Sequence, residues 1–189
     1  MTNAVQRGTA ALVSGDESER DRMTEGIELS RRILSDVEKK LDLAFAIEAP
    51  VAADLRLMIT TLRVVPALER CLELARHLAE RAGFADQFPA DVLASFDEMG
   101  AVTTAMWCKA GTAWQNRDPA MALELDEDDD ELDVLCNELT DRLGLMEDNP
   151  MVAMEGRLIV RFYERLGDHA VHISQRIPYL ATGNEPTPQ

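Results

Sequence analysis

The sequence predicts an all-α protein of antiparallel helices that divides into two similar halves. Apolar residues recur at steps of three and four along most of the 189 residues, the period of helices that pack on one face. No stretch of four or more residues alternates in the manner of a half-buried strand. The 10 glycines and 8 prolines are too few for a β-protein with many turns, and Ala, Leu, Glu and Arg favour helix.

Helix-breaking residues divide the chain into six predicted helices. Gly15 ends a short first helix, Pro50 separates the second from the third, and Gly83 ends the third. Gly183 ends the sixth helix, before a loose tail. The predicted helices span residues 3–14, 17–48, 51–82, 90–117, 119–147 and 151–181.

The later helices begin at proline turns. Phe88-Pro89 opens the fourth helix. Asp118-Pro119 and Asn149-Pro150 each place an N-capping side chain before a proline at the first helical position, where the missing N–H costs nothing. Pro66 falls inside the third helix and is expected to kink or restart it.

Apolar stripes support the five longer helices. Their members at helical spacing are Ile27, Leu34 and Leu41; Leu55, Met58 and Leu62; Phe96, Thr103 and Trp107; Leu125, Leu132 and Leu139; and Ile159, Phe162 and Leu166. The short connections make sequential helices antiparallel neighbours.

The chain repeats itself weakly in two halves. Each half ends in a long helix that begins at a proline turn and carries Glu-Arg a similar distance further on. We expect a first bundle at residues 1–84, a second at 88–183 and a tail at 184–189. The first helix is much shorter than its counterpart, the fourth. Apolar surface left exposed in the first bundle would favour a homodimer.

Charge and composition exclude several classes of partner. The 19 basic and 35 acidic residues give a net charge of −16, which argues against nucleic acid or an anionic bilayer as the main partner. No signal peptide and no run of about 18 apolar residues is seen, so no direct membrane insertion is expected. The three cysteines lack a CxxC pair, which favours a reducing compartment.

On the predicted helices, three pairs of carboxylate residues have members four positions apart. The pairs are Asp129 with Asp133, Glu164 with Asp168, and Glu69 with Glu73. Like charges at this spacing destabilise a helix by about 0.2–0.5 kcal/mol per pair. Water and salt offset this on an exposed face, and Arg161 and Arg165 are also near enough to neutralise the second pair. If two pairs meet across a helix interface, a divalent cation is needed instead. Spacing alone leaves both interpretations open.

Sequence motifs of catalysis are absent. The chain contains no GxxxxGK[ST], GxGxxG, HExxH or GxSxG motif, and Gly167 stands where a di-iron ExxH pair would need histidine. No nucleophile has a base at suitable spacing. We therefore expect a protein that is not an enzyme. No phosphate-binding loop is visible, so direct phosphate sensing is not expected.

The segment RFYERLGDHAVHISQRIPYLATG, residues 161–183, resembles the PhoU family. The family's sixth helix reads like R-Y-x-E-R-I-G-D-H-A. Two further segments resemble the family: APVAADLR, which leads to Glu69-Arg70, is similar to its P-x-A-x-D-L-R element, and DDDELDVL to its acidic D-x-x-x-D element. With the helical layout, the resemblance covers nearly the whole chain.

The resemblance implies a fold of two similar three-helix bundles and a cytoplasmic, non-enzymatic function. PhoU-like proteins regulate phosphate uptake and phosphate-starvation signalling. They act as adaptors between the ATPase subunit of a phosphate ABC transporter and a sensor histidine kinase, and they damp both activities when phosphate is plentiful. Many are homodimers. Recruitment to the inner face of the membrane would occur through these partners.

The resemblance also implies a metal site, since the family's carboxylate motifs hold metal clusters. The residues that match in the second half are Asp129, Asp133, Glu164 and Asp168, which would bind a divalent or iron-type metal cluster. Weaker candidates are Glu69, Glu73 and His169. Counting back from Pro50, the first half places Gly26 and Ser30 at the acidic positions, so its site is expected to be weakened or lost. The alternative function is a metal store or metal-dependent enzyme that uses these carboxylates.

Overall fold

In the computed structural model, the described residues are 1–47, 50–146 and 149–183. Helices account for every regular element within these ranges. The elements are α1 (Thr2–Ser14), α2 (Glu17–Ile47), α3 (Ala52–Glu80), the 3-10 helix η1 (Ala82–Gln87), α4 (Ala90–Asn116), α5 (Pro119–Gly144), α6 (Pro150–Ser174) and α7 (Ile177–Thr182). The all-α prediction is confirmed.

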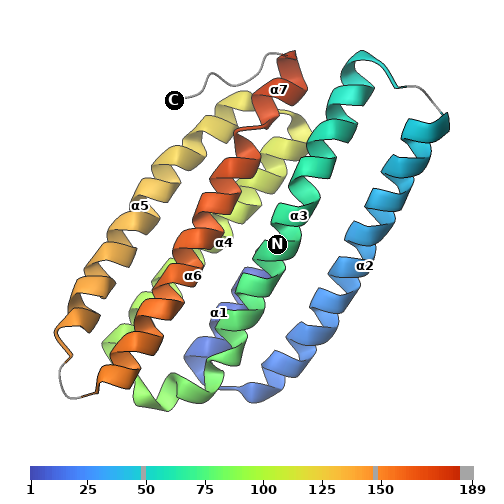
Figure 1. The fold of residues 1–189 in the computed structure, drawn as a ribbon. Helices are drawn as coiled ribbons and strands as arrows, with labels where there is room; N and C mark the ends of the chain where they lie inside the picture. Colours follow the sequence, from blue (N-terminus) through green and yellow to red (C-terminus); the bar gives the residue numbers. More distant parts are fainter. Residues whose placement is uncertain (48–49, 147–148, 184–189) are drawn as a thin grey trace.

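The long helices lie side by side and roughly parallel to one long axis (Figure 1). Helices α1, α2 and α3 form one three-helix group, and α4, α5 and α6 form the other. The groups meet where α1 packs on α4 and where α3 packs on α6. This arrangement confirms the predicted pair of three-helix bundles.

The predicted capping signals act as expected. Asp118 Oδ1 accepts hydrogen bonds from the backbone N–H groups of Ala120 and Met121 at 3.0 and 3.2 Å. Asn149 Oδ1 accepts one from Val152 at 3.3 Å. Gly183, with φ of 82°, ends α7 in the left-handed conformation that glycine adopts without strain.

Some predicted boundaries differ from the structure. The sixth predicted helix stops at Ser174, and α7 begins at Ile177. Pro178 explains the break, because it lacks an N–H and its ring would clash with the carbonyl four residues earlier. Pro66 does not divide α3, which runs from Ala52 to Glu80. Residues 48, 147 and 184–189, where predicted ends and the tail fall, lie outside the described residues.

One apolar core joins the two bundles. Its largest cluster of buried side chains includes Val5 and Leu74 from the first bundle and Phe96 and Ile159 from the second. Tyr163 of α6 is fully buried, and its hydroxyl lies 2.9 Å from Thr9 Oγ1 of α1. The predicted boundary between residues 84 and 88 therefore divides helices that share a core, and it stays a prediction as a domain boundary.

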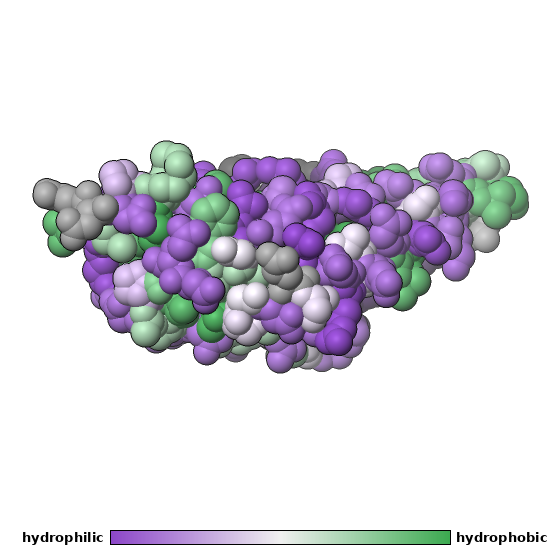
Figure 2. Space-filling model, turned by 90° about the horizontal axis from the view of Figure 1, so that it is seen from below, coloured by the Kyte–Doolittle hydropathy of each residue, from purple (hydrophilic) through white to green (hydrophobic). Residues whose placement is uncertain are grey.

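The first bundle is covered unevenly because α1 has 13 residues and α4 has 27. Beyond Met1, an apolar groove of about 380 Å³ runs between α2, α3 and α4. Seen end-on, the molecule is a flattened slab with apolar residues at its two narrow edges (Figure 2). Exposed apolar side chains there are Leu43 and Ile47 of α2, and Leu145, Met151 and Met154 near the turn between α5 and α6. The part of the chain that the structure describes contains no helix long and apolar enough to cross a bilayer.

Candidate metal centre

The four predicted ligands of the second bundle lie on adjacent helices. Asp129 and Asp133 belong to α5, and Glu164 and Asp168 to α6, which packs along it (Figure 1). Gly167 permits the close approach of the two helices. A Cβ atom at this position would lie 2.6 Å from Leu132 Cδ2 and 2.7 Å from Asp129 Oδ1. The fold thus brings the two predicted carboxylate pairs together.

Burial, and then the crowding of negative charge, raises the pKa of two of these carboxyls. Burial raises the pKa of Asp129 to about 6, and the charges of Asp133 and Asp168 add to the effect. Burial likewise raises the pKa of Asp133, with Glu164 and Asp168 as the strongest charged neighbours. Repulsion therefore acts across the helix interface as well as along each helix.

Cys136 lies beneath the same carboxylates. It is buried, and its Sγ is 3.7 Å from Met99 Sδ. Burial raises the pKa of its thiol to about 12, with contributions from Glu164, Asp133, Asp129 and Asp168. A buried thiol held protonated behaves as a small apolar side chain.

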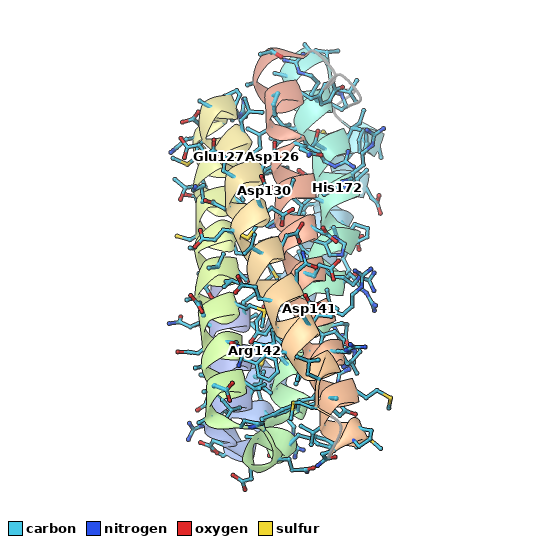
Figure 3. The ribbon with its side chains drawn as sticks, turned by 90° about the vertical axis from the view of Figure 1, so that its left-hand side faces the viewer. Asp126, Glu127, Asp130, Asp141, Arg142 and His172 are labelled. Carbon is cyan, nitrogen blue, oxygen red and sulfur yellow. The ribbon has the colours of Figure 1, made fainter. Side chains whose placement is uncertain are left out.

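Basic side chains neutralise only the margins of the cluster. Arg161 forms an ion pair with Glu164 one turn along α6. Lys109 of α4 lies 2.7 Å from Asp128 Oδ2 and 3.6 Å from Glu124. Asp126, Glu127 and Asp130 lie along the outer side of α5 (Figure 3), where water screens their charge. Among the ion pairs of the described residues, none involves Asp129, Asp133 or Asp168.

The chemistry of these side chains suits a hard cation, since carboxylate oxygens are the preferred ligands of such ions. Their present spacing is looser than a coordination sphere. Within residues 1–47, 50–146 and 149–183, no three His, Cys, Asp or Glu side chains are arranged closely enough to hold one ion. Metal binding at this centre therefore stays a prediction and requires the carboxylates to draw together.

The weaker candidates have other contacts. Glu73 forms ion pairs with Arg31 of α2 and Arg76 of α3, the latter at 2.9 Å. Glu69 is exposed. His169 is half-buried, and its pKa is lowered by burial and then by Arg165. Of the two candidates in the first half, Glu73 is thus already paired with arginines and Glu69 is exposed to solvent.

Gly167 and Cys136 also belong to this centre, although sequence reasoning did not predict their contacts with it. The sequence marked Gly167 only as the residue that breaks an ExxH pattern, and Cys136 only as one of three cysteines without a CxxC pair. Nothing in their spacing indicates which acids they face. The contact between α5 and α6 determines it.

Comparison with known proteins gives a consistent result. A family model described as the PhoU domain matches residues 96–177. The "Phosphate-specific transport system accessory protein PhoU homolog 1" of Mycobacterium tuberculosis is 32% identical over 97% of this chain and 86% of its own length. The crystal structure of PhoU from Pseudomonas aeruginosa has a TM-score of 0.88 at 23% identity, covering 97% of this chain and 90% of that one. The phosphate transport system regulatory protein PhoU from Streptococcus pneumoniae has a TM-score of 0.83 at 22% identity, covering 100% and 90%.

Proposed function

Because the chain belongs to the PhoU family, we propose that it regulates phosphate uptake and phosphate-starvation signalling as an adaptor protein. The observation that carries this proposal is the likeness to curated accessory proteins of phosphate-specific transport, which extends over nearly the whole chain. The absence of catalytic motifs from the sequence is consistent with an accessory role rather than an enzymatic one.

The partners that we propose are the ATPase subunit of a phosphate ABC transporter and a sensor histidine kinase. Their binding would place this protein in the cytoplasm, at the inner face of the membrane. The exposed apolar residues at the edges of the slab support a role in association with other proteins, since such patches commonly mark interaction sites.

Deletion and binding experiments test the adaptor role together. In a cell lacking the gene, phosphate-starvation genes are expected to stay active in phosphate-rich medium. The purified protein is expected to bind the transporter ATPase subunit or the kinase in a pull-down from defined components. Normal repression in the deletion strain, together with no binding to either partner, would reject the proposal.

A second candidate function is metal binding, and the convergence of four carboxylates on one helix interface favours it. Asp129, Asp133, Glu164 and Asp168 would hold a divalent or iron-type cluster, whose positive charge would offset their repulsion. The test is elemental analysis after incubation with Mg²⁺, Mn²⁺ or Fe²⁺. Wild-type protein is expected to retain metal and the Asp129→Asn/Asp168→Asn double variant to lose it. Glu127→Gln/Asp141→Asn, on the outer side of α5, is the matched control (Figure 3).

Metal binding and partner binding are coupled in this proposal. A cation at the acidic centre would present a charge-compensated face to the partner, and its removal would restore repulsion. The affinity for the partner is therefore expected to fall when a chelator is added. Equal affinities with and without chelator would show that the metal has no part in docking.

A further inference from the structure

A row of basic side chains lies along the contact between α3 and α6. We call this row the basic seam. Its members are Arg56, Arg63 and Arg70 of α3, together with Arg165, His169 and His172 of α6 and Arg176 just beyond its end. Steps of seven residues on α3, and of three and four on α6, place each set on one stripe of its helix.

Helices α3 and α6, which carry the two stripes, pack against each other, and their basic groups act on one another electrostatically. Arg63 of α3 lowers the pKa of Arg176, in addition to the larger effect of burial. One level further down, Arg70 of α3 and Arg165 of α6 act together on the buried Cys71 thiol. The seam therefore brings basic groups from both bundles together at two heights.

The arginines of the seam lack acidic partners. Within the described residues, no carboxylate lies within 4.0 Å of Arg56, Arg63, Arg70, Arg165 or Arg176. This is unexpected in a chain of net charge −16, where acids outnumber bases. Most of the other arginines form ion pairs, as Arg142 does with Asp91. The seam concentrates uncompensated positive charge.

Its upper end has hydrogen-bond donors that the protein does not satisfy. The Nε atoms of Arg56 and Arg176 are buried, and neither makes a hydrogen bond to the protein. Arg176 Nη2 donates to His172 Nε2 at 2.8 Å, so the imidazole is oriented by a cation and not by an acid. The backbone of Gly183 lies close against the Arg56 guanidinium, where a Cβ would be 3.1 Å from Nη1. His172 marks this end of the seam in Figure 3, at about the height of Asp130 in that view.

We propose that Arg56, Arg63, His172 and Arg176 form a binding site for a phosphate-type tetrahedral oxyanion. Guanidinium groups present paired N–H donors that match the oxygens of such an ion, and an anion would supply the charge and the acceptors that this end of the seam lacks. The choice of phosphate among oxyanions rests on the proposed function. The side chains of this site come from helices that only the fold brings together. It therefore differs from the glycine-rich phosphate-binding loops, of which the sequence contains none.

The test is titration calorimetry of sodium phosphate into the metal-free full chain at neutral pH, with sodium chloride of equal ionic strength as the reference. Wild-type protein is expected to bind one phosphate per chain. Arg56→Gln and Arg176→Gln are each expected to weaken binding at least about tenfold, the loss typical of a charge-assisted hydrogen bond. Arg63→Gln changes an exposed side chain and keeps the test valid if either of the other variants fails to fold.

Arg142→Gln is the matched control, because it removes the same charge from an arginine of α5 that is paired with Asp91 of α4. Its phosphate affinity is expected to equal that of the wild type. The proposal would be overturned if sodium chloride gave the same binding heat as sodium phosphate. It would also be overturned if all the seam variants bound phosphate with the wild-type affinity. Binding to anionic phospholipid vesicles that free phosphate does not reduce would also overturn it, because the seam would then recognise a surface. Since the assay needs no transporter or kinase, its failure is distinguishable from failure of the adaptor role.

Discussion

At the scale of single residues, the acidic centre determines how the fold responds to pH. Burial and neighbouring carboxylates raise the pKa of Asp129 to about 6, above the ordinary value of 3.8 that it has when unfolded. Between these values the folded chain binds more protons than the unfolded chain, so this group favours folding as the pH falls through about 6. Above that pH, the ionised carboxylate weakens the fold unless a cation compensates it.

Asp129→Asn should therefore stabilise the metal-free protein at neutral pH. Its melting temperature is expected to exceed that of the wild type at pH 7.5, and the gain should shrink as the pH is lowered toward about 5, where Asp129 itself becomes protonated. Thermal unfolding of both proteins across this pH range measures the difference between their melting temperatures. Titration of other groups affects both proteins alike and drops out of this difference. Asp141→Asn, exposed on the same helix and not among the charges that raise the pKa of Asp129, is the control and should show no comparable gain. A gain independent of pH would contradict the explanation.

The buried hydroxyl pair between the bundles gives a second prediction at this scale. Tyr163→Phe removes the partner of Thr9 Oγ1, 2.9 Å away, and leaves a buried hydroxyl that has lost this hydrogen bond. We expect the free energy of unfolding to fall by about 1–3 kcal/mol in chemical denaturation. Tyr179→Phe changes the other tyrosine of the chain, which is only half-buried, and should change stability by less than about 0.5 kcal/mol. Equal losses of unfolding free energy in the two variants would show that the effect does not come from the hydrogen bond between Tyr163 and Thr9.

At the scale of helices, the approach of α6 to α5 depends on a missing side chain. Gly167 faces Leu132 and Asp129, and a Cβ there would come within 2.6 and 2.7 Å of their atoms. Contacts this short require the side chains of Leu132 and Asp129 to shift. Leu132 is fully buried and has little room to move, so overpacking of this kind costs about 1–3 kcal/mol. The shift would also displace the Asp129 carboxylate.

Gly167→Ala is accordingly expected to destabilise the protein by about 1–3 kcal/mol and to weaken whatever metal binding the wild type shows. Gly26→Ala is the matched control, since a Cβ on this exposed residue of α2 meets nothing within 4 Å. Replacing glycine there should stabilise the helix by roughly 0.5–1 kcal/mol. Denaturant unfolding measures both changes. A stabilising effect of Gly167→Ala would show that α5 and α6 are not in close contact at this level.

At the scale of the whole molecule, the sequence predicted the helices better than the contacts between them. Periodicity and capping residues such as Asp118 and Asn149 act locally, so the helices and most of their ends follow from nearby residues. The break after Ser174 was missed because the apolar stripe continues through Ile177 while Pro178 interrupts the backbone. The basic seam could not be predicted, because Arg56 and Arg176 are distant in sequence and only the packing of the two bundles brings their helices together.

The unevenly covered first bundle leads to the prediction for the assembly. More than half of the surface of Leu29, Ile33 and Leu43 on α2 is exposed to solvent. Such a gathering of exposed large apolar side chains on one helix is unusual. We expect a homodimer in solution that buries part of this face. Ile33→Gln combined with Leu43→Gln should raise the dimer dissociation constant at least tenfold, since burial of one such side chain contributes about 1.5–3 kcal/mol. Sedimentation equilibrium measures this constant.

Leu123→Gln, equally exposed on α5, is the control and should leave the dimer intact. A wild-type chain that stays monomeric at the highest concentrations, or a dimer that the α2 changes do not weaken, would rule out this face as the dimer contact.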